Sequence, residues 1–547
     1  MQEPAKPNFL KGAAILAAAS IIVKIIGAIY KIPLFNILDD AGTGSYQVTY
    51  NVYILILTIS TAGIPAALSR LISTAAASGK QRLVKRYFSV ALPAFIVIGV
   101  TAMLVMYLFA DSFAGLMNDS LAAPGIRVLA PAVLFVCIIS VYRGYAQGYE
   151  NMIPTAVSQL AEVICKAAVG FIAAIWLTRM NYASHIVSAG AILGVTVGLG
   201  LCIPVLVWYK KRLDRKQLSP AEDSDWIPSK RGVLWRIMRV SIPITLSSSF
   251  MSIMTVIDTS VVLGRLKESL MITQSISEIA AEAAARVQFG IYTKGLTIYN
   301  LPPAIIVPVS ISIIPAIAAA LARKRSSEAG GIMQSSLKLV NLIAMPAAAG
   351  IMALATPILI ALFNDYRQLT STILLIQGAA SFFVCLQYIT TAILQANGHE
   401  QIALLTFPIG AVVKIALGYI LVAIPGIGII GSAIGTLACF IVISALNIIF
   451  IMVKVKGRPK LIGVFIKPLL CTAAMAGVAF LTYTLVNWLG SGIIGTGRFA
   501  TIVFLGIAIL VAAAVYAVLI IATRTITKED MMLVPKGEKL AKILHIK

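Results

Sequence analysis

Charged side chains are scarce in this sequence. They make up 12% of the 547 residues, whereas about 25% is usual for a soluble chain. Apolar residues account for 59%, and the mean hydropathy is +0.94. Most of the chain divides into apolar blocks of about 20 residues, the length that crosses a bilayer as a helix. We therefore predict an all-α polytopic membrane protein, because strands of an outer-membrane barrel would show a ten-residue alternating pattern that is absent here.

Catalytic signatures are also lacking. The sequence contains no P-loop and no HExxH zinc motif, and its three histidines, His185, His399 and His545, are scattered. The six cysteines lie inside apolar blocks without metal-ligand or redox spacing. We predict a protein that is not an enzyme, with no catalytic residue, no metal and no cofactor.

The net charge of +23 is carried by Lys and Arg residues dispersed through the loops. They form no basic stripe with interleaved aromatics, so nucleic acid is not the predicted partner. The predicted partners of these basic residues are anionic lipids at the cytoplasmic face of the membrane.

We predict about 14 transmembrane helices. They lie at roughly 10–32, 47–74, 88–110, 125–147, 156–178, 184–208, 236–263, 286–320, 333–355, 370–394, 402–423, 429–453, 462–487 and 498–522. The charges of alternate loops test this membrane topology, because cytoplasmic loops are rich in Lys and Arg. One set of loops is basic throughout, and the opposite set carries mainly acids or neutral turns. Both termini are therefore predicted to be cytoplasmic.

An internal repeat predicts the domain organisation. Residues 145–170 align on 393–418 at a shift of 248, which pairs Lys166 with Lys414, and Ile64 and Pro65 match Ile314 and Pro315 at a shift of 250. Two similar halves in one orientation predict parallel six-helix lobes with a substrate cavity at their interface. The predicted parts are an N-terminal lobe (1–208), a basic cytoplasmic linker (209–235), a C-terminal lobe (236–454), two additional helices (455–523) and a cytoplasmic tail (524–547).

Basic residues inside the apolar blocks are the candidate site, because a charge at the bilayer centre costs between ~3 and ~15 kcal/mol. They are Lys24, Lys31, Arg70, Lys166 and Lys414. Lys31 and Arg70 lie close enough to helix ends to reach water by snorkelling, and Lys166 follows Glu162 by four residues, the order of a local ion pair. Lys24 and Lys414 have no obvious local acid, so we predict that they line an aqueous cavity. Phosphate or pyrophosphate suits such bases best.

Asp258 is the best candidate for a coupling-ion ligand, although the sequence slightly favours a solvated position at the rim of its span over that role. The segment 264–285 is either a small surface helix or a flexible connector. The predicted bending points are residues that interrupt regular helices. They are Gly63, Pro65, Pro302, Pro303 and Pro315.

The block RGYAQGYENMIPTAVSQLAEVICK, Arg143–Lys166, resembles the polysaccharide-biosynthesis branch of the MOP superfamily, of the SpoVB, YtgP and MurJ type. The segments GIPAALSRLIS, IDTSVV and AILQANGHEQ agree with it. The resemblance implies a MATE-like fold with a cationic central cavity in the bacterial plasma membrane. It also implies flipping of an undecaprenyl-pyrophosphate-linked sugar, most often the peptidoglycan precursor lipid II.

The family's first-span pattern is matched by Lys24 to Gly27, but Tyr30 stands where MurJ-type members carry Arg, with Lys31 beside it. Some members bind sodium near a position that resembles Lys414, where a fixed ammonium would replace a bound cation. Coupling to the membrane potential or to a monovalent cation is predicted, because a potential that is negative inside assists outward movement of an anion.

We predict a monomeric lipid II flippase that works by alternating access in the cell envelope, with cell-wall synthesis enzymes as further partners. Three alternatives stay open. They are a flippase for capsule, teichoic or exopolysaccharide units, a multidrug exporter for organic cations, and a membrane scaffold that recruits wall-synthesis enzymes.

Overall fold

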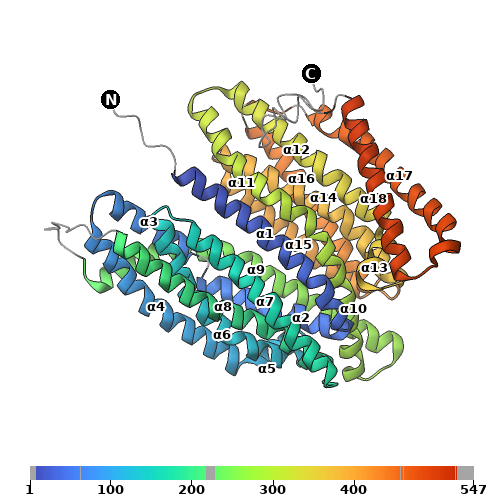
Figure 1. The fold of residues 1–547 in the computed structure, drawn as a ribbon, viewed down its shortest axis with the longest axis horizontal. Helices are drawn as coiled ribbons and strands as arrows, with labels where there is room; N and C mark the ends of the chain where they lie inside the picture. Colours follow the sequence, from blue (N-terminus) through green and yellow to red (C-terminus); the bar gives the residue numbers. More distant parts are fainter. Residues whose placement is uncertain are drawn as a thin grey trace. The chain divides into compact units, whose positions relative to one another are not determined.

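The computed structural model consists of helices and the turns that join them in the part of the chain that it describes, residues 8–61, 63–216, 228–455, 457–459, 461–523 and 525 (Figure 1). Residues 217–227 of the predicted linker lie outside the described residues, as does the predicted tail except for Thr525.

The helices follow one another with short connections. Those of the first part of the chain are α1 (Asn8–Ile37), α2 (Asp40–Thr61), α3 (Ile64–Ala77), α4 (Gln81–Leu108), α5 (Ala110–Leu116), the 3₁₀ turn η1 (Ser120–Ala122), α6 (Ala123–Gly148), α7 (Ile153–Arg179), α8 (Ser184–Lys216) and α9 (Lys230–Gln274). Those of the second part are α10 (Glu278–Tyr299), α11 (Leu301–Ala322), α12 (Ser326–Ala353), α13 (Ala355–Phe363), α14 (Gln368–Ala396), α15 (Glu400–Val422), α16 (Ile430–Lys454), α17 (Leu461–Ile494) and α18 (Arg498–Ala522).

The predicted number of membrane spans is confirmed. Fourteen helical segments among the described residues are long and apolar enough to cross a bilayer. The eighth is Leu301–Ala322, which is shorter than the predicted 286–320 because α10 precedes it as a separate helix.

The segment 264–285 is neither a surface helix nor a flexible connector. It holds the end of α9 and the start of α10, and the left-handed Ser275 (φ 50°) lies between them.

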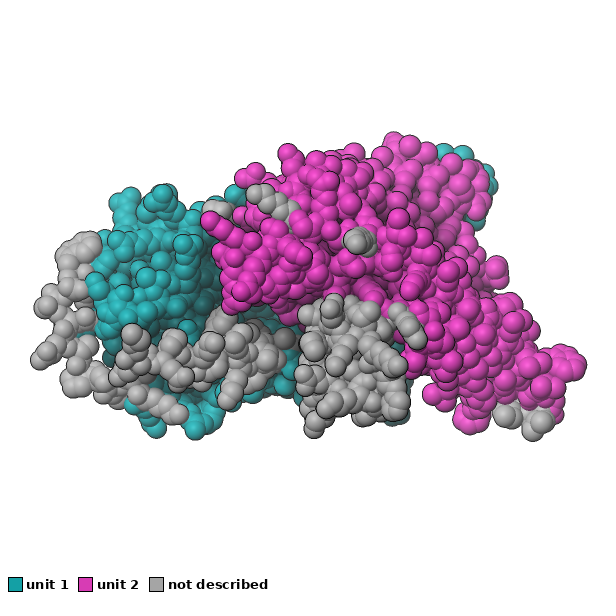
Figure 2. Space-filling model, turned by 90° about the horizontal axis from the view of Figure 1, so that it is seen from above, with its two compact units in different colours: residues 1–290 teal, residues 291–547 magenta. Residues whose placement is uncertain are grey.

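The chain divides into two compact units, residues 1–290 and residues 291–547, shown in different colours in Figure 2. In the first unit, α1 packs on α7, and α9 packs on α2, α3 and α4. In the second unit, α17 packs on α12, and α18 packs on α13 and α17. The lobes 1–208 and 236–454 were predicted from the repeat, and their boundaries stay a prediction.

Helix boundaries repeat between the two halves of the sequence. Both α4 and α12 have 28 residues, and each is followed after one residue by a short helix, α5 or α13. Each short helix is followed by an asparagine with positive φ, Asn118 (54°) or Asn364 (53°). A buried aspartate comes next, Asp119 or Asp365. Shared helix lengths, breaks and Asn–Asp turns indicate that the two halves have a common plan.

Two helix breaks lie at or next to predicted bending points. Gly63 separates α2 from α3, and Asn300 separates α10 from α11. Pro65 and Pro302 are each the second residue of the helix that follows, where proline lacks only an amide hydrogen that would be unpaired anyway. Pro315, which the sequence repeat pairs with Pro65, lies inside α11. The pairing of Pro65 with Pro315 at a shift of 250 stays a prediction.

Candidate functional site

Two ammonium groups of the first unit share one aromatic ring. The Nζ of Lys31 on α1 lies 5.7 Å from the ring centroid of Tyr50 on α2, and the Nζ of Lys166 on α7 lies 4.9 Å from the same centroid. Lys31 also lies 6.0 Å from the ring of Phe35. The negative face of an aromatic ring attracts a cation, so Tyr50 offsets part of the repulsion between the two lysines. We call Lys31, Tyr50 and Lys166 the lysine pair site.

The acid that the sequence offered as an alternative partner of Lys166 is already neutralised by another residue. Glu162 accepts a hydrogen bond from the guanidinium of Arg143 at 3.0 Å, and the Nε of Arg143 donates to Ser158 at 2.9 Å. Among the residues that the structure describes, no carboxylate forms an ion pair with Lys31 or Lys166. The lysine pair site therefore carries an excess of positive charge.

Glycines of α8 fix the backbone that carries Lys166. A Cβ added to Gly194 would lie 2.4 Å from the carbonyl oxygen of Lys166, and one added to Gly198 would lie 2.9 Å from that of Glu162. Small residues spaced by four allow membrane helices to pack backbone against backbone. Gly194 and Gly198 therefore allow α8 to pack closely on α7 and fix the position of the two helices relative to each other.

Lys24 lies on the same face of α1 as Lys31, because seven residues make about two helical turns. Its side chain is exposed. A methyl group on the intervening Gly27 would have no neighbouring atom within 4 Å, so this stretch of α1 has an open face. Lys24 can therefore extend the lysine pair site along α1.

Arg70 is not part of this group. It is exposed on α3, 20 positions after Tyr50, which corresponds to about 30 Å along a helix. The structure therefore places Arg70 near the far end of its span, where it was expected to reach water.

Lys414 occupies a position in the second unit that resembles that of Lys166 in the first. It is half-buried on α15, and a Cβ added to Gly435 of α16 would lie 3.1 Å from its carbonyl oxygen. The surrounding polar groups differ. Thr406 donates to Asn447 at 2.9 Å, and Asn447 donates to Thr390 at 3.2 Å, so an uncharged network lies next to α15 where the first unit has the Arg143–Glu162 ion pair.

Asp258 lies on α9 and is only 8% exposed, which excludes the solvated rim position. Neighbouring residues of α9 bind α2: Asn51 donates to Thr259 at 3.0 Å, and Ser252 donates to Thr58 at 3.0 Å. The role of Asp258 in binding a coupling ion stays a prediction.

Gly63 is needed at its bend because another helix approaches closely. A Cβ there would lie 2.2 Å from the carbonyl oxygen of Ser241, and the Gly63 amide donates to Thr245 at 3.1 Å. Pro303 follows Pro302 in the first turn of α11. Whether these residues act as hinges stays a prediction.

Sequence reasoning missed several charged residues inside the predicted spans. Arg143, Arg286 and Lys294 satisfy the same rule that selected Lys24, since each is a charge within an apolar block. Lys294 is 7% exposed and lies 5.9 Å from the ring of Phe363. Tyr50 carried no signal of its own, because an aromatic residue inside a span is common.

Residues 9–321 match the family model described as polysaccharide biosynthesis protein. The chain belongs to this family. It is 27% identical to the membrane protein YabM of Bacillus subtilis over 98% of this chain and 96% of that one. It is 24% identical to the stage V sporulation protein B of that organism, covering 97% of this chain and 98% of the relative. It is 23% identical to its lipid II flippase MurJ, with 93% and 94% covered.

Solved structures show the same fold. A lipid II flippase MurJ in an inward closed conformation superposes with a TM-score of 0.66 at 16% identity, over 93% of this chain and 99% of that one. An inward-facing MATE transporter of the MOP superfamily gives a TM-score of 0.62 at 17% identity, over 79% and 97%. The chain is thus a multi-pass membrane protein of the polysaccharide biosynthesis family, and its fold resembles those of MATE transporters and MurJ, as the sequence predicted.

Proposed function

We propose that this transporter is a flippase for an undecaprenyl-pyrophosphate-linked saccharide, and that its substrate is lipid II. It moves the headgroup from the inner to the outer leaflet by alternating access. The observation that carries the proposal is the lysine pair site, two ammonium groups at one ring with no carboxylate partner among the described residues. Charge-assisted hydrogen bonds to pyrophosphate oxygens would neutralise both.

The similarity to MurJ of Bacillus subtilis over 93% of the chain supports this choice of substrate. A multidrug exporter for organic cations is less well supported, because Glu162 is engaged by Arg143. The potential across the plasma membrane, negative inside, would assist outward movement of an anion by about 2.3 kcal/mol per charge per 100 mV. We propose that this potential or a monovalent cation at Asp258 drives the cycle, and that both termini are cytoplasmic.

In this mechanism the polyprenyl chain stays in lipid while the pyrophosphate binds Lys31 and Lys166. Lys24 first contacts the headgroup, since it is exposed on the same face of α1. Lys414 contributes from the second lobe, and the breaks at Gly63 and Pro302 allow the spans to bend. Arg70 has no assigned contact with pyrophosphate in this proposal, because it lies far from Tyr50 along the chain.

Transport of labelled lipid II in proteoliposomes tests the proposal. Replacing Lys31 and Lys166 together by Met is expected to lower the flipping rate at least tenfold, because a charge-assisted hydrogen bond contributes about 1.5–3 kcal/mol. A matched control replaces two exposed lysines at helix ends, Lys211 and Lys230, by Met and is expected to retain the rate.

A second variant, Lys24→Met with Lys414→Met, examines the two remaining bases. Full activity of that variant would reject their assignment. The wild type is also expected to complement a strain that lacks its own lipid II flippase. Failure to do so, with transport of another polyprenyl-pyrophosphate saccharide, would reject lipid II and keep the substrate class.

A further inference from the structure

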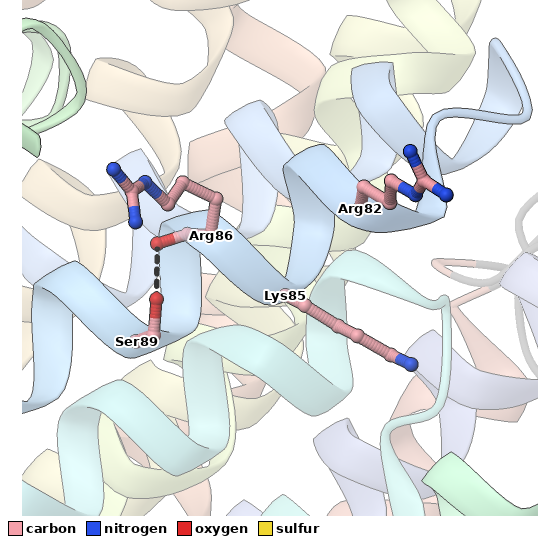
Figure 3. Close-up of a pocket in the computed structure, with 4 residues that line it drawn as sticks. All are labelled: Arg82, Lys85, Arg86 and Ser89. Atoms are coloured by element: carbon pink, nitrogen blue, oxygen red, sulfur yellow. Dashed lines mark hydrogen bonds between the residues drawn. The ribbon is translucent and has the colours of Figure 1, made fainter. Parts of the chain in front are cut away.

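A cationic hollow lies at the start of α4, apart from the lysine pair site. It has a volume of about 420 Å³ and is lined by Arg82, Lys85, Arg86 and Ser89 (Figure 3). Three of its four lining residues are bases, and none is an acid. Figure 3 shows the three cationic ends spread apart along about two turns of α4, with the Ser89 hydroxyl donating to the Arg86 carbonyl at 3.0 Å.

One donor of this hollow is buried without an acceptor. The Nε of Arg86 has no hydrogen-bond partner in the described part of the chain, although solvent does not reach it. Leaving such a group unsatisfied costs about 1–3 kcal/mol, and more where the group is charged. An anionic oxygen in the hollow removes this cost only if the Arg86 side chain turns so that Nε faces the hollow.

The length of α4 indicates that the hollow lies at the level of the lipid headgroups. α4 has 28 residues and spans about 42 Å, whereas the hydrocarbon core is about 30 Å thick. At its far end, α4 stays apolar and exposed up to Leu108 (68%). The surplus length therefore belongs to the basic end, which the loop charges predict to be cytoplasmic.

The same helix face continues as an apolar track. From Ser89, exposed residues recur every three or four positions at Pro93, Val97, Thr101 and Leu104, the spacing of one helical face. Val97 is 65% exposed and Leu104 is 46% exposed. The cationic hollow followed by an apolar helix face matches the headgroup and acyl chains of a phospholipid. A free phosphate would contact only the hollow.

We propose that the start of α4 binds the phosphoryl headgroup of an anionic phospholipid, whose acyl chains lie along the apolar face of this helix. Lys85 and Arg86 bind the phosphate oxygens. This inference goes beyond the proposed function and does not depend on which saccharide the protein carries.

The test is retention of phosphatidylglycerol by the purified full-length protein, measured by native mass spectrometry as lipid is titrated. The variant Lys85→Gln with Arg86→Gln is expected to weaken binding about twenty-fold, because each base near an anionic surface contributes about a fivefold factor. The control, Lys211→Gln with Arg215→Gln, removes two exposed charges at the end of α8 and is expected to change binding less than twofold. Melting temperatures of both variants verify that they are folded.

Equal weakening in both variants would overturn the proposal, since general surface charge would then explain binding. Equal retention of phosphatidylcholine, or displacement of phosphatidylglycerol by an equal concentration of inorganic phosphate, would also overturn it. A fourth contrary outcome is unchanged lipid binding with lost flipping, which would assign the hollow to the path of the transported substrate. Flipping by the wild type is measured separately, so failure of one proposal does not imply failure of the other.

Discussion

Arg286 and Asp119 form a buried ion pair in which the Nε of Arg286 lies 2.5 Å from Oδ1 of Asp119. The two side chains are 7% and 0% exposed. Ser45 donates to the other carboxylate oxygen at 2.9 Å, and Arg286 also contacts Glu282 at 3.0 Å. Burial raises the pKa of Asp119 despite Arg286. The pair joins the start of α10 to α2 and to the turn before α6.

Replacing Arg286 by Met is expected to destabilise the protein strongly, by about 3–5 kcal/mol, because it leaves a buried carboxylate without a partner. Thermal unfolding in detergent measures this loss. The control is Arg127→Met, whose pair with Asp111 is 40% and 70% exposed and is therefore worth about 0–1 kcal/mol. Similar melting temperatures for the two variants would contradict the structural role of Arg286.

Gly194→Ala is expected to lower stability by about 1–3 kcal/mol. The new methyl would lie 2.4 Å from the carbonyl oxygen of Lys166, so α8 would have to move away from α7. Gly27→Ala is the matched control in α1, where no atom lies within 4 Å. That control is expected to be neutral or stabilising by up to about 1 kcal/mol, since alanine favours a helix. The opposite order of melting temperatures would show that α7 and α8 do not pack through Gly194.

Sequence patterns predicted the membrane spans because each needs only a long apolar run. They also selected Lys31 and Lys166, because a charge in such a run is conspicuous. They could not predict that these two residues meet, since the contact depends on how α1, α2 and α7 pack around Tyr50. The same limit applies to Glu162, whose local sequence favoured Lys166 while the fold brought Arg143 closer.

Whether Glu162 pairs with Arg143 or with Lys166 can be tested by substitution. Glu162→Gln is expected to destabilise the protein by about 1–3 kcal/mol, because Arg143, which is 15% exposed, would lose its counter-charge, while Glu162 itself is 30% exposed. Adding Arg143→Met to this variant is expected to restore most of the loss, whereas adding Lys166→Met is not. Unfolding curves of the single and double variants measure the coupling. Restoration by Lys166→Met instead would show that Lys166 is the true partner.

Protonation of Asp365 is expected to lower the stability of the protein at acidic pH. Burial alone would raise its pKa, but hydrogen bonds from Arg367 and Thr370 outweigh burial and lower it. A carboxyl with a lowered folded-state pKa contributes stability above its unfolded pKa, about 3.9, and loses it as the pH falls through the folded value. Asp365→Asn is expected to lose about 1 kcal/mol at pH 7, since Arg367 is 43% exposed. The variant should also show a smaller drop in melting temperature between pH 5 and pH 3 than the wild type, and an equal drop would contradict this role.

Tyr50 is expected to matter through its ring and not through its hydroxyl. Tyr50→Phe keeps an aromatic face for both ammonium groups and should retain flipping of labelled lipid II. Tyr50→Leu removes two cation–π contacts, each worth about 0.5–2 kcal/mol, and should lower the rate roughly tenfold. Because the lysines would then repel each other without compensation, Tyr50→Leu combined with Lys31→Met should lose less than the sum of the two single effects. Wild-type flipping by Tyr50→Leu would show that the two lysines do not act through a shared ring.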